Sequence, residues 1–158
     1  MSTLTRIARI LTGLVFVFSG FVKGIDPMGT AFKIGDYLTA FGMEWLDGIA
    51  LPLSVLLCLV EFVTGMMLIT GSLVTLASWM AALFMALFTP LTLVLAIYNP
   101  VSDCGCFGDA IVMTNWQTFF KNIVITLLVV FVFARRREKT AALPVVIGLN
   151  ATLEFVFL

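Results

Sequence analysis

Two cysteines separated by a single glycine, Cys104 and Cys106, form the clearest chemical signal in the sequence. They lie in a short polar segment, residues 101–109, of an otherwise apolar chain. A disulfide between them needs a tight turn, which Gly105 permits because glycine adopts conformations closed to other residues. Strained, exposed disulfides tend to be oxidising and easily reduced. The spacing therefore predicts a thiol–disulfide exchange site.

Two alternatives stay open for the cysteine pair. It could form a purely structural disulfide, either within the pair or to a partner chain. Metal binding is the weakest alternative, because zinc sites usually take four ligands and the chain has no histidine, so we expect no metal site. Asp103 and Asp109 flank the pair and disfavour a thiolate, although backbone N–H groups in a loop can offset this effect.

The composition predicts where these residues are held. The chain of 158 residues is 61% hydrophobic and 11% charged, whereas an ordinary soluble domain is about 45–50% apolar. Its apolar residues form long uncharged runs, which are typical of an integral membrane protein in contact with the lipid bilayer. Nine basic and nine acidic residues cancel, so no net field points to nucleic acid. The absence of histidine excludes imidazole-based catalysis.

The apolar runs predict an all-α fold, an integral membrane helical bundle in a single transmembrane domain, residues 1–158. The first run follows Arg6 and Arg9 but lacks a signal-peptide cleavage pattern, so we expect an uncleaved helix. The last run ends without a polar flank, which suggests a natural chain that continues past Leu158. The expected spans are residues 6–23, 49–69, 72–98, 116–134 and 141–158, with an interfacial helix over 30–46 and a cysteine loop over 99–115.

Local signals set the predicted helix boundaries. Asp26 and Pro27 favour an N-cap and a first helical position. The Thr114–Gln117 spacing is that of a capping box at the start of the fourth span. Pro90 removes one backbone hydrogen bond in the third span, which predicts a kink. For the amphipathic 30–46 segment we expect an interfacial anchor; a lid over the cysteine loop is the less favoured interpretation.

The basic residues predict the orientation of the bundle. Six of them share the side of the N-terminus: Arg6, Arg9, Arg135, Arg136, Arg137 and Lys139. The opposite side has three: Lys23, Lys33 and Lys121. The positive-inside rule therefore predicts a cytoplasmic N-terminus. The cysteine loop then faces the periplasm or the cell exterior, where disulfides persist.

Glu61 is the second candidate functional residue, because a carboxylate near mid-bilayer is costly unless it is neutralised or paired. It could act as a proton relay or contact a quinone. Alternatively, it could be protonated and bonded to Ser19, Thr64 or Thr92. Cys58, three residues away on the same helical face, is best interpreted as a small buried residue.

Lys23 lies at the outer end of the first span. It could pair with Asp26 or with the helix that carries Glu61, and snorkelling of its amine to the interface explains it equally well.

Three stretches together resemble the DoxX/MauE group of bacterial redox-associated membrane proteins. They are the pattern from Arg9 to Pro27 with its Phe-Ser-Gly-Phe-x-Lys core, Glu61 followed by Gly65 and Gly71, and Asp-Cys-Gly-Cys-Phe-Gly-Asp over 103–109. The resemblance implies a four-helix transmembrane bundle, with a layout like that of vitamin K epoxide reductase, and a role in extracytoplasmic thiol–disulfide chemistry. The chain has Cys-x-Cys where that reductase has Cys-x-x-Cys, which argues against direct quinone reduction.

The sequence therefore predicts a thiol–disulfide oxidoreductase whose Cys104 and Cys106 pass electrons between a periplasmic thiol or disulfide protein and a membrane carrier. If the carrier is a quinone, Phe88, Trp116 and Phe119 are candidate wall residues. The alternative is a non-catalytic subunit or scaffold of a larger membrane complex, with a structural disulfide in its loop. A transporter, motivated by Glu61 and Pro90, is less favoured because no inverted repeat is evident.

Overall fold

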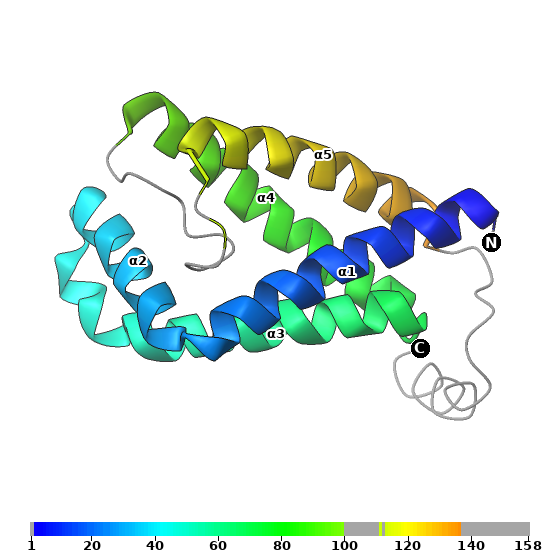
Figure 1. Cartoon of the computed structure of the whole chain (residues 1–158), viewed down its shortest axis with the longest axis horizontal. Helices are drawn as coiled ribbons and strands as arrows, with labels where there is room; N and C mark the ends of the chain where they lie inside the picture. The colour runs from blue at the N-terminus through cyan, green and yellow to red at the C-terminus, as the bar shows by residue number, and fades with distance from the viewer. Residues whose placement is uncertain (1, 100–110, 112, 137–158) are drawn as a thin grey trace.

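The computed structural model describes residues 2–99, 111 and 113–136. All regular structure in this part of the chain is helical, with five α-helices and one 3-10 helix (Figure 1). Four helices are long and apolar enough to cross a membrane, which confirms the predicted all-α bundle. They are α1 (Thr3–Ile25), α3 (Ala50–Thr70), α4 (Val74–Tyr98) and α5 (Asn115–Ala134). The predicted fifth span, 141–158, lies outside the described residues.

The predicted boundary signals act at the helix ends. The Asp26 carboxylate accepts a hydrogen bond from the Gly29 N–H at 2.9 Å, with Pro27 in the first position of α2 (Pro27–Ala40). The Thr114 hydroxyl accepts from the Gln117 N–H at 3.3 Å, and the Gln117 side chain accepts from the Thr114 N–H at 3.1 Å. This reciprocal pair confirms the capping box that starts α5.

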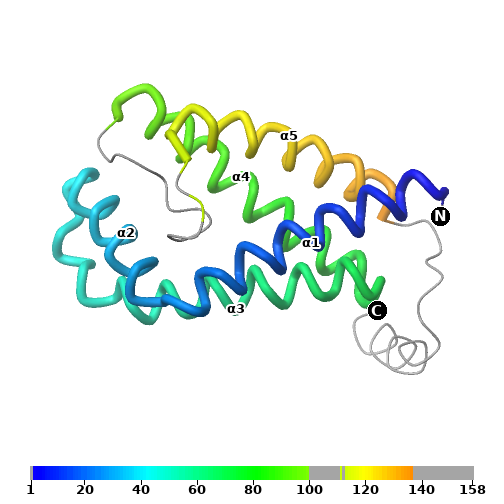
Figure 2. The backbone as a smooth tube through the Cα atoms, in the orientation of Figure 1, coloured from blue at the N-terminus to red at the C-terminus, as the bar shows by residue number. Residues whose placement is uncertain are grey.

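The segment predicted as one interfacial helix is divided in two. α2 ends at Ala40, and a 3-10 helix, η1 (Glu44–Ile49), follows after a three-residue turn. Gly42 lies in this turn with φ +72°, a left-handed conformation that glycine adopts without strain and that ends an α-helix. Figure 2 shows both pieces at the end of the bundle away from the N-terminus.

α1 and α3 pack against each other through glycines. A Cβ atom added to Gly20 would lie 2.7 Å from the backbone nitrogen of Phe62, and one added to Gly13 would lie 2.8 Å from the carbonyl oxygen of Gly65. Glycine at these positions lets the two backbones come nearly into contact, as small residues do in membrane helix pairs. The contacts also show that α1 and α3 run antiparallel.

α4 and α5 form the second antiparallel pair, which polar side chains hold together. The Asn122 amide donates to the Thr92 hydroxyl at 3.2 Å, and the hydroxyls of Thr89 and Thr126 lie 2.9 Å apart. Such bonds stabilise helix pairs in an apolar surrounding by about 0.6 kcal/mol each. Pro90 lies inside α4, which is helical from Val74 to Tyr98, and the kink expected at this position stays a prediction.

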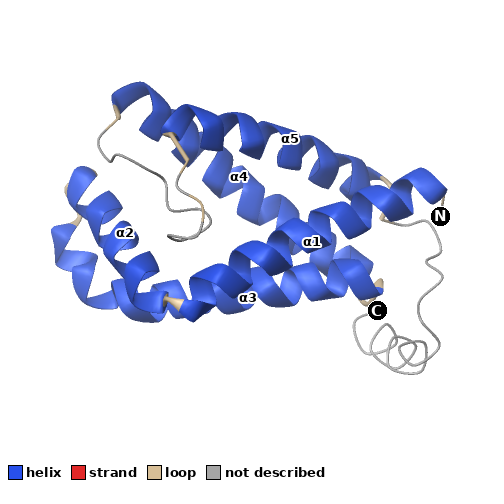
Figure 3. Ribbon diagram, in the orientation of Figure 1, coloured by secondary structure: helices blue, strands red, loops and turns tan. Residues whose placement is uncertain are grey.

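Figure 3 shows that the regular structure of the described residues is helical throughout, and buried side chains from both helix pairs form a common core. Each long helix also exposes large apolar side chains such as Leu14, Leu59, Leu83 and Leu127, as expected for a surface that faces lipid. The core cluster contains Ala8, Phe16, Leu68, Ala77, Ala81, Met85, Ile125, Val129 and Val132.

The start of α1 and the end of α5 lie at the same end of the bundle, and the end of α4 and the start of α5 lie at the other (Figure 1). The first of these ends therefore carries Arg6, Arg9, Arg135 and Arg136. The second is the end at which the cysteine segment joins α4 to α5.

Candidate functional site

A buried ion pair joins α1 to α3. The Lys23 Nζ atom lies 2.9 Å from the Glu61 Oε2 atom, and the two side chains are 8% and 7% exposed. Lys23 therefore pairs with the helix that carries Glu61 and not with Asp26, whose side chain caps the start of α2. Thr64 and Thr92 donate their hydroxyl protons to the carbonyls of Val60 and Thr89, so neither donates to Glu61.

The glycine contact explains why the two charges meet. Lys23 lies on the buried face of α1, three positions after Gly20. Gly20 contacts the backbone of α3 at Cys58 and Phe62, and Glu61 lies on the buried face of α3 between these two residues. Close approach of the backbones therefore brings a long amine within reach of the carboxylate.

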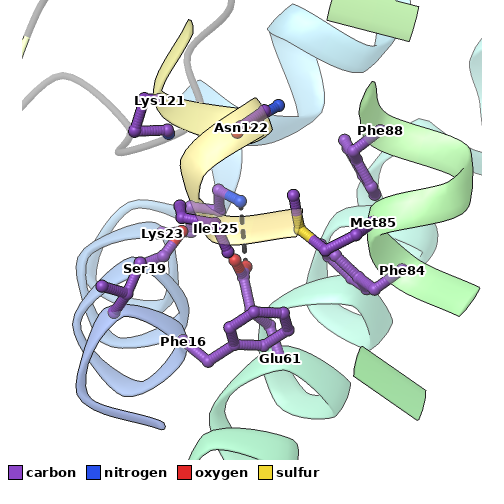
Figure 4. A pocket seen from close by; sticks show the side chains of 11 residues that line it. Phe16, Ser19, Lys23, Glu61, Phe84, Met85, Phe88, Lys121, Asn122 and Ile125 are labelled. Carbon is purple, nitrogen blue, oxygen red and sulfur yellow. Dashed lines mark hydrogen bonds and ion pairs between the residues drawn. The ribbon is translucent and has the colours of Figure 1, made fainter. Parts of the chain in front are cut away.

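A small cavity of about 30 Å³ adjoins the ion pair. It has room for an ordered water molecule, and Lys23, Glu61 and Asn122 place polar groups beside it. Figure 4 shows side chains from all four long helices converging on it. The lining residues are Val15, Phe16, Ser19, Lys23, Glu61, Phe84, Met85, Phe88, Lys121, Asn122 and Ile125.

One side of the cavity is aromatic. The Lys23 Nζ atom lies 6.0 Å from the ring centroid of Phe88, within the range of a cation–π contact. Phe84 stacks on Phe88 with centroids 4.4 Å apart, and Phe16 meets Phe84 edge-on at 5.7 Å. The site therefore combines a charged pair with a flat apolar wall.

α5 adds Lys121 and Asn122, which sequence reasoning did not single out as site residues. Lys121 was used only in counting the basic residues on each side of the membrane. The signal that could have found them is a lysine followed by an asparagine in an apolar span, since polar residues inside a span usually face the bundle interior. Asn122 is buried and also bonds to Thr92, so it connects the cavity to the α4 and α5 interface.

The structure does not bring the three predicted aromatic wall residues together. Phe88 lines the cavity. Trp116 and Phe119 instead contact each other edge-on, with centroids 6.2 Å apart, and form a separate cluster with Phe120 at the start of α5. Neither lines the cavity beside the ion pair.

The predicted redox residues, Cys104, Gly105 and Cys106, and their neighbours Asp103 and Asp109, lie outside the described residues. The helix ends that this segment connects are Tyr98 of α4 and Asn115 of α5. Asn115 donates to the Asn99 side chain at 2.8 Å, which ties these two helix ends together. Cys58 is a buried free cysteine, as predicted from its place in an apolar span.

Four apolar spans and a charge pair in the interior define a multi-pass helical membrane protein. The family model described as Methylamine utilisation protein MauE matches residues 1–135, and the chain belongs to this family. The match confirms the MauE part of the resemblance seen in the sequence, and the DoxX part stays a prediction. Comparison with curated proteins and with solved structures gives no match.

Proposed function

We propose that this MauE-family protein is a thiol–disulfide redox protein of the bacterial inner membrane, in which Cys104 and Cys106 cycle between a dithiol and a disulfide. The observation that carries the proposal is the attachment of the Cys-Gly-Cys segment at the end of the bundle opposite the four arginines of α1 and α5. With the arginine end in the cytoplasm, the N-terminus is cytoplasmic and the cysteines face the periplasm.

The reaction follows ordinary thiol–disulfide exchange. One thiolate of the reduced pair attacks the disulfide of a periplasmic partner protein, which forms a mixed disulfide and releases one partner thiolate. The second thiolate of the pair then attacks the mixed disulfide, and the second partner thiolate leaves. The pair is oxidised by two electrons and the partner is reduced by two. The reverse sequence of steps oxidises the partner.

If the membrane carrier is a quinone, the direction of exchange decides which of its forms returns the pair to its starting state. When the pair has reduced its partner, oxidation of a quinol supplies the two electrons and two protons that convert the disulfide back to the dithiol. When the pair has oxidised its partner, reduction of a quinone takes up the two electrons and two protons that the dithiol releases. Phe88 then belongs to the wall of the quinone site. Trp116 and Phe119, at the start of α5, are the other candidate wall residues. Glu61, paired with Lys23 beside a cavity of water size, exchanges the protons between the carrier and the outer end of the bundle.

Thiol trapping tests the cysteine couple. In spheroplasts, a membrane-impermeant maleimide should modify Cys104 and Cys106 after mild reduction and neither of them after mild oxidation, and the change should be reversible. Cys58→Ser provides the matched control, because Cys58 is buried within α3 and its loss should leave the trapping pattern unchanged. Cysteines that react in neither redox state would remove the proposal.

The same variants separate exchange from a scaffold role. The double variant Cys104→Ser/Cys106→Ser should lose turnover of the partner's thiols while the protein still inserts in the membrane. If the double variant keeps its partners assembled and their disulfides correctly formed, the loop is structural and the protein is a non-catalytic subunit.

A further inference from the structure

Arg9 is a buried cation for which the described residues provide no counter-charge. It lies on the inward face of α1 and is 3% exposed. Its Nε and Nη1 atoms are buried and make no hydrogen bond to any part of the chain that the structure describes. Guanidinium groups stay charged in proteins, and a buried charge without a partner costs several kcal/mol. Arg9 therefore requires a partner from elsewhere.

The position of Arg9 is that of the bilayer edge. Gly13, one turn further along α1, contacts Gly65 and Ile69 of α3, so Arg9 lies level with the end of α3 near Gly71. It precedes Lys23 by fourteen positions, about 21 Å at helical rise. Side chains on a helix point toward its N-terminus, so the guanidinium is directed to the first turn of α1 and the membrane surface.

The surroundings of Arg9 attract anions. Arg6 lies three positions before it and is exposed, and Arg135 and Arg136 end α5 at the same end of the bundle. The Arg136 guanidinium stacks on Phe133, with its Cζ 3.8 Å from the ring centroid, and its Nε also makes no hydrogen bond among the described residues. None of the carboxylates in the described residues lies at this end of the bundle. Glu61 pairs with Lys23 in the interior, and the others lie toward the opposite end: Asp26, Asp36, Glu44 and Asp47.

We propose that Arg9 binds the phosphate group of an anionic membrane phospholipid, with Arg6, Arg135 and Arg136 adding attraction. Arginine is well suited to phosphate because several N–H donors lie in one rigid plane. Basic pockets between transmembrane helices are suited to acidic lipid headgroups. A lipid is favoured over free phosphate because the site lies on a membrane-spanning helix at headgroup depth, where a lipid is held at high local concentration. The proposal is independent of the redox function.

The test uses the full chain in nanodiscs of phosphatidylcholine, with and without phosphatidylglycerol, and in detergent with inorganic phosphate. For the wild type, phosphatidylglycerol should raise the thermal unfolding midpoint and remain bound in native mass spectrometry. Arg9→Met should weaken retention of this lipid by roughly 10-fold or more, the range for loss of charged hydrogen bonds. Arg9→Lys, which keeps the charge but not the planar donors, should bind with intermediate affinity.

The variant also distinguishes a lipid site from a structural role. In phosphatidylcholine alone, Arg9→Met should unfold at the same temperature as the wild type or higher, because it removes a buried charge that has no partner among the described residues. Arg6→Met is the matched control: the exposed arginine should contribute a smaller part of the lipid effect.

Three results would overturn the proposal. Arg9→Met could lower the midpoint equally with and without phosphatidylglycerol, which would show a partner within the protein. Glu138→Gln, in the segment outside the described residues, could reproduce the loss seen for Arg9→Met, which would identify a carboxylate of the chain itself. Inorganic phosphate could stabilise the protein at concentrations as low as the lipid does, which would make the ligand a soluble anion.

Discussion

The two buried cations on α1 differ in where their counter-charge comes from. Lys23 and Arg9 lie on the same face of one helix, 7% and 3% exposed, near opposite ends. Lys23 has a carboxylate of the chain at 2.9 Å, and Arg9 has none in the described part. The difference teaches that Lys23 finds its counter-charge on a neighbouring helix of the bundle, whereas the described part of the chain provides none for Arg9.

The largest effect should come from removing Lys23. Lys23→Met leaves the Glu61 carboxylate buried without a partner, which costs about 3–5 kcal/mol when one member of a buried pair is lost. Unfolding in detergent with increasing denaturant measures the change.

The double variant Lys23→Met/Glu61→Leu is the control for this loss. It removes both charges and should recover most of the stability, since apolar replacement of a buried pair is often neutral. A single variant as stable as the wild type would show that the pair is not needed to keep Glu61 in the bundle.

The glycine contact that brings Lys23 to Glu61 gives the next largest effect. Gly20→Ala places a Cβ atom 2.7 Å from the Phe62 nitrogen, and overpacking of this kind typically costs about 1–3 kcal/mol. Gly24→Ala is the matched control one turn later, where an added Cβ meets nothing within 4 Å. It should stabilise the helix by about 0.5–1 kcal/mol. Equal effects at the two positions would contradict the close contact.

A carboxylate introduced beside Arg9 should supply the counter-charge within the chain, as Glu61 does for Lys23. Arg6→Glu places a carboxylate three positions before Arg9 at an exposed site of α1, and an i,i+3 ion pair of this kind is worth about 0.2–0.5 kcal/mol on a helix surface. Thermal unfolding in phosphatidylcholine should show stabilisation, and the added effect of phosphatidylglycerol should shrink. Thr3→Glu adds the same charge off this face and should not change the lipid response.

A comparably small effect should come from the polar contact behind the cavity. The bond between Asn122 and Thr92, at 3.2 Å, should contribute a coupling of about 0.6 kcal/mol in a double-mutant cycle with Asn122→Leu and Thr92→Val. Measured in the same denaturant series as Lys23→Met, this value would show that the ion pair, and not its polar neighbours, dominates the stability of the Lys23 end. A coupling as large as the Lys23 effect would reverse that order.

Long uncharged runs and helix-capping residues made most of the described fold predictable from the sequence. The uncharged runs identified the four spans, and local residues such as Asp26 and the Thr114–Gln117 pair marked where helices begin, because their side chains satisfy free N–H groups at those positions. The break between α2 and η1 was not predicted. The helical spacing of apolar residues continues past Gly42, but the left-handed backbone conformation of Gly42 interrupts the helix there.

The candidate site was predictable only in part, because a charged residue in a span indicates burial but not its partner. Glu61 and Lys23 were each identified, yet their pairing depends on how closely α1 approaches α3. Lys121 and Asn122 reach the cavity through the packing of α5 on the other helices, which no local pattern encodes. The lack of a partner for Arg9 among the described residues is likewise a property of the assembled bundle.

The division of the bundle into two helix pairs has a mechanical consequence. Glycine contacts lock α1 to α3, and asparagine and threonine bonds lock α4 to α5, while the cavity lies along the seam where the two pairs meet. Tilting one pair against the other changes the width of this seam without disrupting either internal lock. We therefore expect the volume of the compartment around Lys23 and Glu61 to follow any tilt of one helix pair against the other.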